Sequence, residues 1–254
     1  MITFEKNLIL FPFFKKKPTL QSLIPKEYID IHNHVLPGID DGAADVPTSM
    51  QLLSSMHKIG IEKCIATPHT LHGVWNNTTE SIQNAYQVLQ PSLDQLHQTQ
   101  VIKAASEYMI DNSLMDRVQQ KTPLLTLKDR WVLLEMSYQS APLGLFEIIF
   151  ELQLQGYDIV LAHPERYYFY HSHFSMYEKL KQARIKFQLN LLSVTGHYGK
   201  DVAIVAEQLL KAGMIDFTGT DIHHARHIAY FNNPVMVKET SPLCDAIANN
   251  AFFK

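Results

Sequence analysis

The stretch Tyr28-Ile-Asp-Ile-His-Asn-His34, followed directly by Val35-Leu-Pro-Gly-Ile-Asp-Asp-Gly42, decides the fold of this chain. Its short apolar run with alternating character predicts a β-strand. The run ends in His32 and His34, whose side chains point to the same side of an extended chain and can bind one metal ion. The turn that follows carries two aspartates, which offer further oxygen ligands. Taken alone, the stretch also fits a strand end with two exposed histidines.

Strands and helices alternate along the chain from this point. Apolar runs predict seven strands, at residues 28–34, 61–66, 101–105, 131–134, 157–162, 187–191 and 214–218. Helical patterns lie between them, which indicates parallel βαβ units. Neither form of glycine-rich phosphate loop is present, so we expect a closed or nearly closed α/β barrel rather than an open nucleotide-binding sheet.

Length and composition predict a single domain. The 254 residues can form one α/β barrel over residues 28–254, preceded by an N-terminal extension of residues 1–27. A formal net charge of −3 gives no general attraction to nucleic acid, so no nucleic-acid partner is expected. Thirteen histidines are many for this length, and neutral imidazole is the commonest metal ligand. The composition therefore favours a metalloprotein.

The N-terminal extension contains an apolar segment, Leu8–Phe14, that is followed by Lys15, Lys16 and Lys17. A membrane-spanning helix needs roughly 20 apolar residues, so no transmembrane segment is predicted here. We expect the extension to pack on the domain, and contact with a membrane surface or a partner is the alternative. With no evident signal peptide and only two cysteines, a cytoplasmic location is expected.

Potential metal ligands follow six of the seven predicted strands. In an α/β barrel the carboxyl ends of all strands meet at one rim, so we expect these side chains to lie together. They are His32, His34, His69, Glu107, Glu135, His163, Asp221 and His223. A single histidine at a strand end is usually structural, but repetition at strand after strand favours a metal site. Imidazole and carboxylate without thiolate suit Mn²⁺, Zn²⁺ or Fe, and so many ligands need more than one ion.

Such a cluster indicates phosphate chemistry. Two or more ions about 3.5–4 Å apart are typical of enzymes that hydrolyse phosphate esters. Arg166, three residues after His163, is predicted to neutralise a phosphoryl oxygen with its planar guanidinium. An ordinary surface ion pair is the alternative for this arginine. The aromatic run Tyr167–Tyr170 fits either a wall for a phenyl ring or packing against a helix.

These motifs resemble those of the polymerase-and-histidinol-phosphatase (PHP) superfamily, and within it those of the bacterial capsule-associated, manganese-dependent tyrosine phosphatases. The resemblance runs from about Tyr28 to about Ile228, and its most specific parts are Leu36-Pro-Gly-Ile-Asp-Asp-Gly-Ala43 and His163-Pro-Glu-Arg166. It implies a distorted seven-stranded (β/α) TIM-like barrel. It also implies three metal ions per chain, expected to be Mn²⁺, with Fe, Zn or Mg as alternatives.

Carried over residue by residue, the resemblance implies three ion sites and a phosphate contact. The ions would be held by His32, His34, Glu107 and Asp221 in the first site, by Glu107, Glu135 and His163 in the second, and by Asp41, His69 and His223 in the third. Arg166 would bind the phosphate, and Arg166 and Asp41 would be the catalytic residues. Arg226 is implied as a second substrate contact, although the stretch His224–His227 does not align securely with the family's pattern.

The resemblance implies a metal-dependent protein-tyrosine phosphatase. Its partner would be the tyrosine-rich tail of a bacterial tyrosine autokinase that controls capsule or exopolysaccharide synthesis. A cysteine-based mechanism is excluded because it needs Cys-x5-Arg, whereas Thr70 stands six residues after Cys64 and Asn250 stands six residues after Cys244. Two alternatives stay open: a phosphatase acting on histidinol phosphate, and a non-catalytic metal-stabilised module of a larger assembly.

Overall fold

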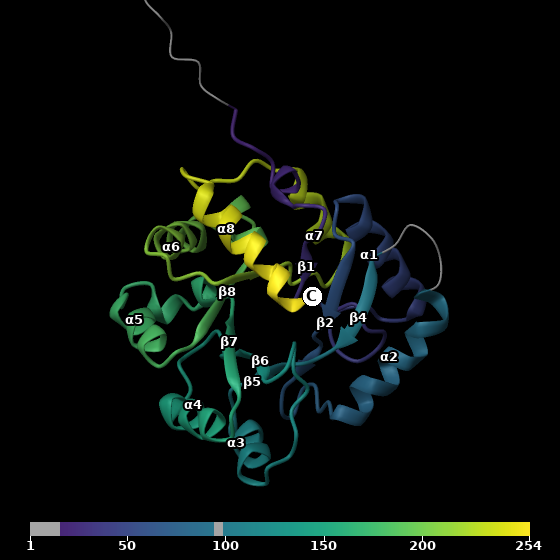
Figure 1. Cartoon of the computed structure of the whole chain (residues 1–254), viewed down its shortest axis with the longest axis vertical. Helices are drawn as coiled ribbons and strands as arrows, with labels where there is room; N and C mark the ends of the chain where they lie inside the picture. The colour runs from purple at the N-terminus through teal and green to yellow at the C-terminus, as the bar shows by residue number, and fades with distance from the viewer. Residues whose placement is uncertain (1–15, 94–98) are drawn as a thin grey trace, which may run out of the picture.

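The computed structural model of the chain describes residues 16–93 and 99–254. Figure 1 shows the strands gathered at the centre, with helices arranged around them. The strand pairs are all parallel, which confirms the predicted α/β class. The described residues contain no helix with the length and apolar composition of a membrane span.

The C-terminal part of the predicted extension packs on the domain. The backbone N–H of Leu20 donates to the carbonyl of Asn233, and that of Val235 donates to the carbonyl of Pro18, both at 3.0 Å. The side chain of Leu20 is fully buried. Packing is therefore confirmed for this part of the extension, whereas the apolar segment Leu8–Phe14 lies outside the described residues.

The strands of the described residues form two sheets. The first sheet contains, in spatial order, β1 (Ile29–Asp30), β2 (Lys63–Ala66) and β4 (Gln100–Ala104). The second contains, in spatial order, β3 (His69–Thr70), β5 (Glu107–Met109), β6 (Trp131–Glu135), β7 (Asp158–Ala162), β8 (Lys186–Asn190) and β9 (Phe217–Gly219).

The short strands β3 and β5 are not predicted by the sequence pattern. A break at Pro68, which has no N–H to donate to a partner strand, separates β2 from β3. β3 pairs with β5 so that His69 lies opposite Glu107, and β5 pairs with β6 so that Met109 lies opposite Glu135. The register of these short strands brings three predicted ligands to one edge.

Helices cover the outside of the strands (Figure 1). They are α1 (Val46–Lys58), α2 (Thr79–Leu93), α3 (Asn112–Gln119), α4 (Leu145–Leu154), α5 (Ser175–Gln182), α6 (Lys200–Lys211), α7 (Ala225–Ala229) and α8 (Ser241–Asn249). Helix α1 begins after Asp45, whose side chain caps it by accepting a hydrogen bond from the N–H of Thr48 at 2.8 Å. The last two helices lie beyond the last predicted strand, where the sequence pattern predicts no element.

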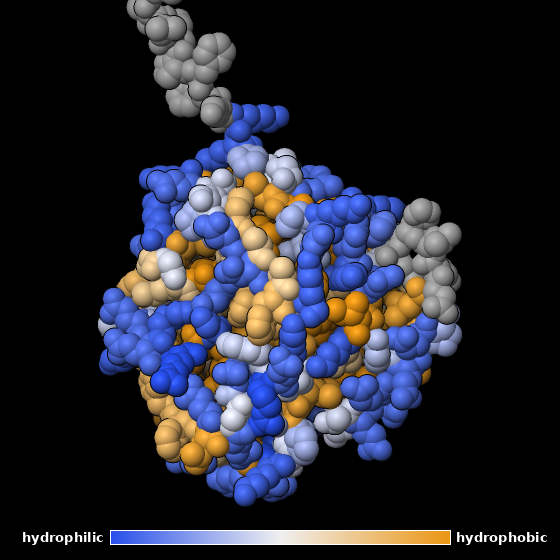
Figure 2. Space-filling view, viewed as in Figure 1, coloured by the Kyte–Doolittle hydropathy of each residue, from blue (hydrophilic) through white to orange (hydrophobic). Residues whose placement is uncertain are grey.

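Apolar side chains from both sheets share one core. Ile31, Ile65, Leu133 and Val160 pack in a single cluster, and each is at most 1% exposed. Two further apolar layers lie between the strands and the helices. Figure 2 shows an apolar patch at the lower left of the visible face, over α4.

Side chains complete the junction between β1 and β9. Backbone pairing there is limited to a parallel bridge between Asn33 and Ile222, just beyond the two strands. The buried Asn250 spans the rest of the junction. Its Nδ2 donates to the carbonyls of Ile29 (2.8 Å) and Thr218 (2.7 Å), and its Oδ1 accepts from the N–H of Thr218 (2.9 Å). One amide therefore replaces several backbone hydrogen bonds of a regular strand pair.

We expect Asn250→Ala to lower the free energy of unfolding by about 3 kcal/mol, because buried backbone groups lose their partners. Denaturant titration measures the change. Asn249→Ala is the matched control, since Asn249 is exposed and donates one hydrogen bond, to the carbonyl of Asp216. Its expected loss is less than about 1 kcal/mol. Equal losses in the two variants would show that the amide does not hold the junction.

Candidate metal centre

Nine predicted ligand side chains meet at the carboxyl ends of the strands. They form four overlapping groups in which the ligand atoms lie within 4.8 Å of one another. The groups are His34, Asp41, His69 and His223; His32, His34 and Asp221; His32, Glu107 and His163; and His69, Glu107 and Glu135. Residues from six separate strand ends therefore contribute to one cluster.

In the first site implied by sequence, two histidines lie close to two carboxylates. The Nε2 atoms of His32 and His34 are 3.4 Å apart. Oδ1 of Asp221 lies 3.3 Å from each of them, and Oε2 of Glu107 lies 3.1 and 3.4 Å from them. Ligands about 2.0–2.1 Å from a shared ion have similar mutual distances. Both Nε2 atoms thus lie close to both carboxylates, and His32, His34 and Asp221 form one of the four groups.

Glu107 joins this group to the others. Its Oε1 lies 3.1 Å from Nε2 of His163, while its Oε2 lies 3.1 Å from Nδ1 of His69. Glu135 approaches the same Nδ1 of His69 at 2.8 Å. The second set implied by sequence, Glu107 with Glu135 and His163, is therefore divided between two of the four groups.

Three buried atoms at the centre of the cluster fit a bound cation. Oε2 of Glu107, Oε1 of Glu135 and Nδ1 of His69 have close neighbours but no partner with hydrogen-bonding geometry among the described residues. Buried polar atoms in proteins are nearly always satisfied. A divalent cation would satisfy all three atoms at once, so the donor set fits the metal ions that the sequence predicts.

The charges of the buried ligands depend on one another. Burial opposes ionisation of Glu107, but the imidazoles of His32 and His69 hold its pKa well below the usual range. Burial and the neighbouring Glu107 carboxylate raise the pKa of Glu135. Burial, together with the Arg166 cation, lowers the pKa of His163 to about 4. His163 is thus neutral at physiological pH, the form that binds metals.

Asp41 closes the cluster on its open side. The Asp41 side chain is 54% exposed, and its Oδ1 lies 3.6 Å from Nε2 of His69 and 3.4 Å from Nε2 of His223. The hydrogen bond with His223 is the main cause that lowers the pKa of Asp41 to about 2. This partly exposed carboxylate is therefore ionised at neutral pH.

Asp40 belongs to none of the ligand groups, but it holds two of the ligand residues in position. Its Oδ2 accepts hydrogen bonds from Nδ1 of His34 (2.7 Å) and from the N–H of His69 (3.1 Å). Its Oδ1 accepts from the N–H of Gly42 at 2.9 Å. Because Nδ1 of His34 donates to Asp40, the neutral form of this imidazole presents the lone pair of Nε2 to the cluster. The sequence suggests Asp40 as an oxygen ligand, and the structure gives it this orienting position instead.

Two polar residues of β8 support the ligands in the same way. Oε1 of Gln188 lies 2.7 Å from Nδ1 of His32, and Nδ2 of Asn190 donates to Oδ2 of Asp221 at 3.0 Å. Neither residue is predicted from the sequence, because β8 is the predicted strand without an ionisable residue at its end. The alternation in Lys186–Asn190 puts both amides on one face of a buried strand, a signal that would have found them.

Arg166 lies inside the site. Its Nη1 donates to Oδ2 of Asp221 at 2.6 Å, and its side chain is only 17% exposed. The guanidinium lies 4.7 Å from the ring centre of Tyr138 and 4.0 Å from that of Tyr198. Burial disfavours its charged form, but Tyr138 and Asp221 raise its pKa above the usual value, so it stays a cation. These two tyrosines were not identified from the sequence.

The other aromatic and basic candidates occupy different environments. Tyr167 is fully buried and donates to the carbonyl of Ala162 at 3.0 Å, so it packs in the core. Tyr168 is 55% exposed. Arg226 is exposed on α7 and belongs to none of the four ligand groups.

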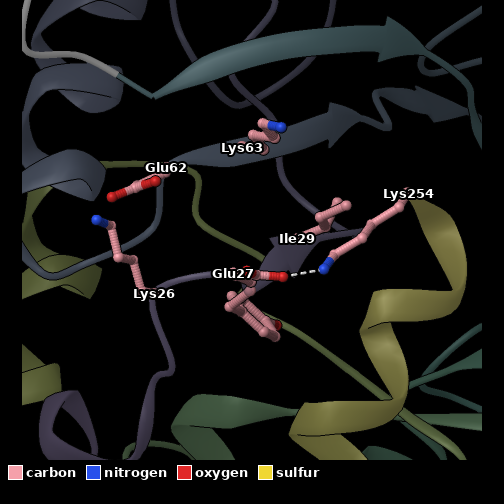
Figure 3. A pocket seen from close by; sticks show the side chains of 7 residues that line it. Lys26, Glu27, Ile29, Glu62, Lys63 and Lys254 are labelled. Carbon is pink, nitrogen blue, oxygen red and sulfur yellow. Dashed lines mark hydrogen bonds and ion pairs between the residues drawn. The ribbon is translucent and has the colours of Figure 1, made fainter.

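A separate cavity lies at the opposite ends of β1 and β2 (Figure 3). It has a volume of about 380 Å³ and is lined by Lys26, Glu27, Tyr28, Ile29, Glu62, Lys63 and Lys254. Lys254 forms an ion pair with Glu27 across it. This cavity contains none of the nine ligands, so it is not part of the metal centre.

Comparison with known proteins identifies one matching family and relatives named as tyrosine-protein phosphatases. The family described as capsular polysaccharide synthesis, CpsB/CapC, matches residues 28–238. Tyrosine-protein phosphatase YwqE of Bacillus subtilis (strain 168) is 30% identical over 205 residues, which cover 78% of each chain. Tyrosine-protein phosphatase CpsB of Streptococcus pneumoniae is 25% identical over 140 residues, which cover 55% of this chain and 57% of that protein.

A solved structure has a similar fold. It comes from work on YwqE from Bacillus subtilis and CpsB from Streptococcus pneumoniae, described there as unique metal-dependent tyrosine phosphatases. It matches with a TM-score of 0.72 and 27% identity, over 89% of this chain and 88% of the solved chain.

We expect Asp40→Ala to weaken Mn²⁺ binding by about 10- to 100-fold, because His34 and the backbone of His69 lose their orienting carboxylate. Isothermal titration of metal-free protein measures the affinity. Asp45→Ala is the control from the same loop, since Asp45 caps α1 and contacts no ligand. It should lower stability by about 1 kcal/mol and leave the affinity for Mn²⁺ unchanged. Wild-type affinity in Asp40→Ala would refute the orienting role.

Proposed function

The chain belongs to the CpsB/CapC family of capsular polysaccharide synthesis proteins, and we propose on this basis that it is a metal-dependent phosphatase that hydrolyses phosphotyrosine in proteins. The observation that carries the proposal is the meeting of nine ligand side chains and Arg166 at one rim. The names of the relatives, which are tyrosine-protein phosphatases, support the substrate class. The description of the similar solved structure supports the need for metal.

We infer that the two sheets make up the distorted seven-stranded barrel of the PHP type. Counting β2 with β3 and β4 with β5 as continued strands leaves seven strand positions. The N–H of Asp221 donates to the carbonyl of His32 at 2.7 Å, and that of His34 donates to the carbonyl of Ile222 at 3.0 Å. These bonds join the first strand position to the last, which supports closure.

The nine side chains are the proposed ligands of a cluster of divalent ions, three by resemblance, with Mn²⁺ as the expected metal. Bound ions of this kind supply Lewis-acid stabilisation of phosphoryl oxygens and a nucleophile at neutral pH. The protein orients Nε2 of His32 and His34 toward the ions, because Gln188 and Asp40 occupy the Nδ1 atoms. It also supplies Glu107, whose two oxygens face different groups.

Arg166 is the proposed phosphate contact. Its guanidinium is held by Asp221 and lies near two tyrosine rings, so its position is fixed before substrate arrives. A planar guanidinium with free N–H groups can donate to a phosphoryl oxygen as negative charge develops. Asp41 is ionised at neutral pH and cannot act as a proton donor. A phenol with a pKa of about 10 leaves without a strong general acid, which suits phosphotyrosine.

The proposed partner is the phosphorylated, tyrosine-rich tail of a bacterial tyrosine autokinase, and the proposed setting is the cytoplasmic control of capsule or exopolysaccharide synthesis. The family description, which names capsular polysaccharide synthesis, supports this setting. The two alternatives are histidinol phosphate as substrate and a non-catalytic, metal-stabilised role. Substrate comparison with reconstituted protein separates all three.

We expect metal-stripped protein to be inactive and Mn²⁺ to restore turnover of a phosphotyrosine peptide. The restored enzyme should prefer this peptide over histidinol phosphate by at least about tenfold in kcat/KM, equal to about 1.4 kcal/mol. The reason is that histidinol phosphate needs a partner for its ammonium group, and the acidic residues in the ligand groups are proposed to bind metal instead.

Both substrates are assayed at one pH with one enzyme preparation. The reverse preference would favour the histidinol phosphate alternative. Inactivity toward both substrates, with metals bound, would favour the non-catalytic alternative. Fewer than two ions per chain in active protein, by elemental analysis, would contradict the multi-ion cluster.

We expect Arg166→Ala to lower kcat by roughly 10²–10³ while metal content is retained, the scale of losing one preorganised charge-stabilising donor. Retention is expected because Asn190 still holds Asp221. Arg226→Ala is the companion variant, and a fall in kcat/KM of tenfold or more there would support the second phosphate contact. Wild-type kcat in Arg166→Ala would mean that this arginine only balances the charge of Asp221.

A further inference from the structure

Helix α4 is apolar on both of its faces. Leu145, Ile148, Ile149 and Leu152 are buried against the strands. Phe146, Phe150 and Leu154, spaced four residues apart, form a stripe on the outer face and are 41%, 59% and 69% exposed. The outer face of a surface helix is ordinarily polar. Packing within the domain therefore does not account for these three exposed apolar side chains.

The stripe belongs to a larger apolar surface. Leu143, just before α4, is 97% exposed, and Tyr138 in the same loop is 44% exposed. Five of the twelve exposed large apolar side chains in the described parts of the chain fall within residues 138–154. We call Leu143, Phe146, Phe150 and Leu154 the α4 patch. Figure 2 shows an apolar area at the lower left of the visible face, over α4.

The α4 patch is connected to the metal centre through one loop. The loop leaves β6 after Glu135, a predicted ligand, and reaches Leu143 within eight residues. At its start, the Tyr138 ring lies 4.7 Å from the Arg166 guanidinium, and its hydroxyl lies 3.4 Å from Nε2 of His163. The same loop thus lines the mouth of the site at one end and begins the α4 patch at the other.

Acidic side chains border the α4 patch. Glu147 and Glu151 lie beside the stripe on α4, and neither forms an ion pair with another described residue. A second copy of α4 placed antiparallel on this face would bring like charges together. An occupant with apolar and basic side chains fits better, because it buries the stripe and neutralises the carboxylates.

We propose that the α4 patch binds the polypeptide that carries the substrate phosphotyrosine, through apolar side chains and a lysine or arginine near the phosphorylated residue. The proposal rests on the proposed phosphatase function and assigns its substrate recognition. Helix α4 has ten residues and is about 15 Å long. An extended segment covers that length with about five residues. Recognition therefore reaches several residues beyond the phosphotyrosine itself.

The test compares a double variant, Phe150→Gln with Leu154→Gln, against wild type on two kinds of substrate. One is free phosphotyrosine, and the other is a phosphotyrosine peptide of about twelve residues with leucines and lysines on both sides. We expect kcat/KM for the peptide to fall about tenfold and kcat/KM for free phosphotyrosine to stay unchanged. Val88→Gln with Ile204→Gln is the matched control, because these residues are 60% and 54% exposed on α2 and α6.

Several results would overturn the proposal. Equal losses on both substrates, or equal losses in the control variant, would remove any specific role of the α4 patch. A second peptide carries serines and glutamates in place of the leucines and lysines. If wild type turned over both peptides equally well, the α4 patch would have no role in recognising the substrate. A wild-type dimer in light scattering that dissociates in the double variant would make the patch a contact between copies.

The readouts also separate this proposal from the proposed function. If wild type hydrolyses neither substrate, the phosphatase assignment fails. Fluorescence anisotropy with the labelled leucine–lysine peptide then decides about the α4 patch. Binding that weakens about tenfold in the double variant and not in the control supports the patch, and equal binding by all three proteins overturns it.

Discussion

The buried carboxylate of Glu107 is the constraint on which the rest of the structure depends. A charged group without solvent is strongly unfavourable unless opposite charges and donors surround it. Here His32, His69 and His163 each approach one of its two oxygens at 3.1 Å. These residues come from three different strand ends, so the carboxylate is tolerated only when the strands are correctly aligned. The register of β3 against β5, with His69 opposite Glu107, meets that condition.

The surroundings of the cluster keep its geometry fixed. Asp40 holds His34 and His69, Gln188 holds His32, and Asn190 holds Asp221, and all three supporting residues are buried. His163 and Asp221 have left-handed backbone angles, with φ of 34° and 53°, which are uncommon for residues other than glycine. Such strain persists only where the surrounding structure imposes it. The centre is thus held by its neighbours before a metal or substrate arrives.

Much of the cluster could be predicted from sequence because parallel strands deliver their carboxyl ends to one rim. Histidines and carboxylates at the ends of six of the seven predicted strands, such as Glu107 and Glu135, were therefore enough to place the cluster. The division of ligands between groups was not predictable, since it depends on distances of a few tenths of an ångström. Gln188 and Asn190 were not predicted as part of the site, because neither side chain is ionisable. The strands β3 and β5 were not predicted, because two or three residues are too few to show an alternating apolar pattern.

The junction between β1 and β9 has a consequence for synthesis on the ribosome. Asp30 binds the Thr220 hydroxyl, a partner 190 residues later in the chain. At 5–20 residues per second, about 10–40 s separate the emergence of the two. During that time one edge of β1 has no native partner, and open strand edges favour aggregation. With only two residues in regular pairing, β1 offers little of such an edge. Its shortness therefore protects the nascent chain while the partner strand is still being made.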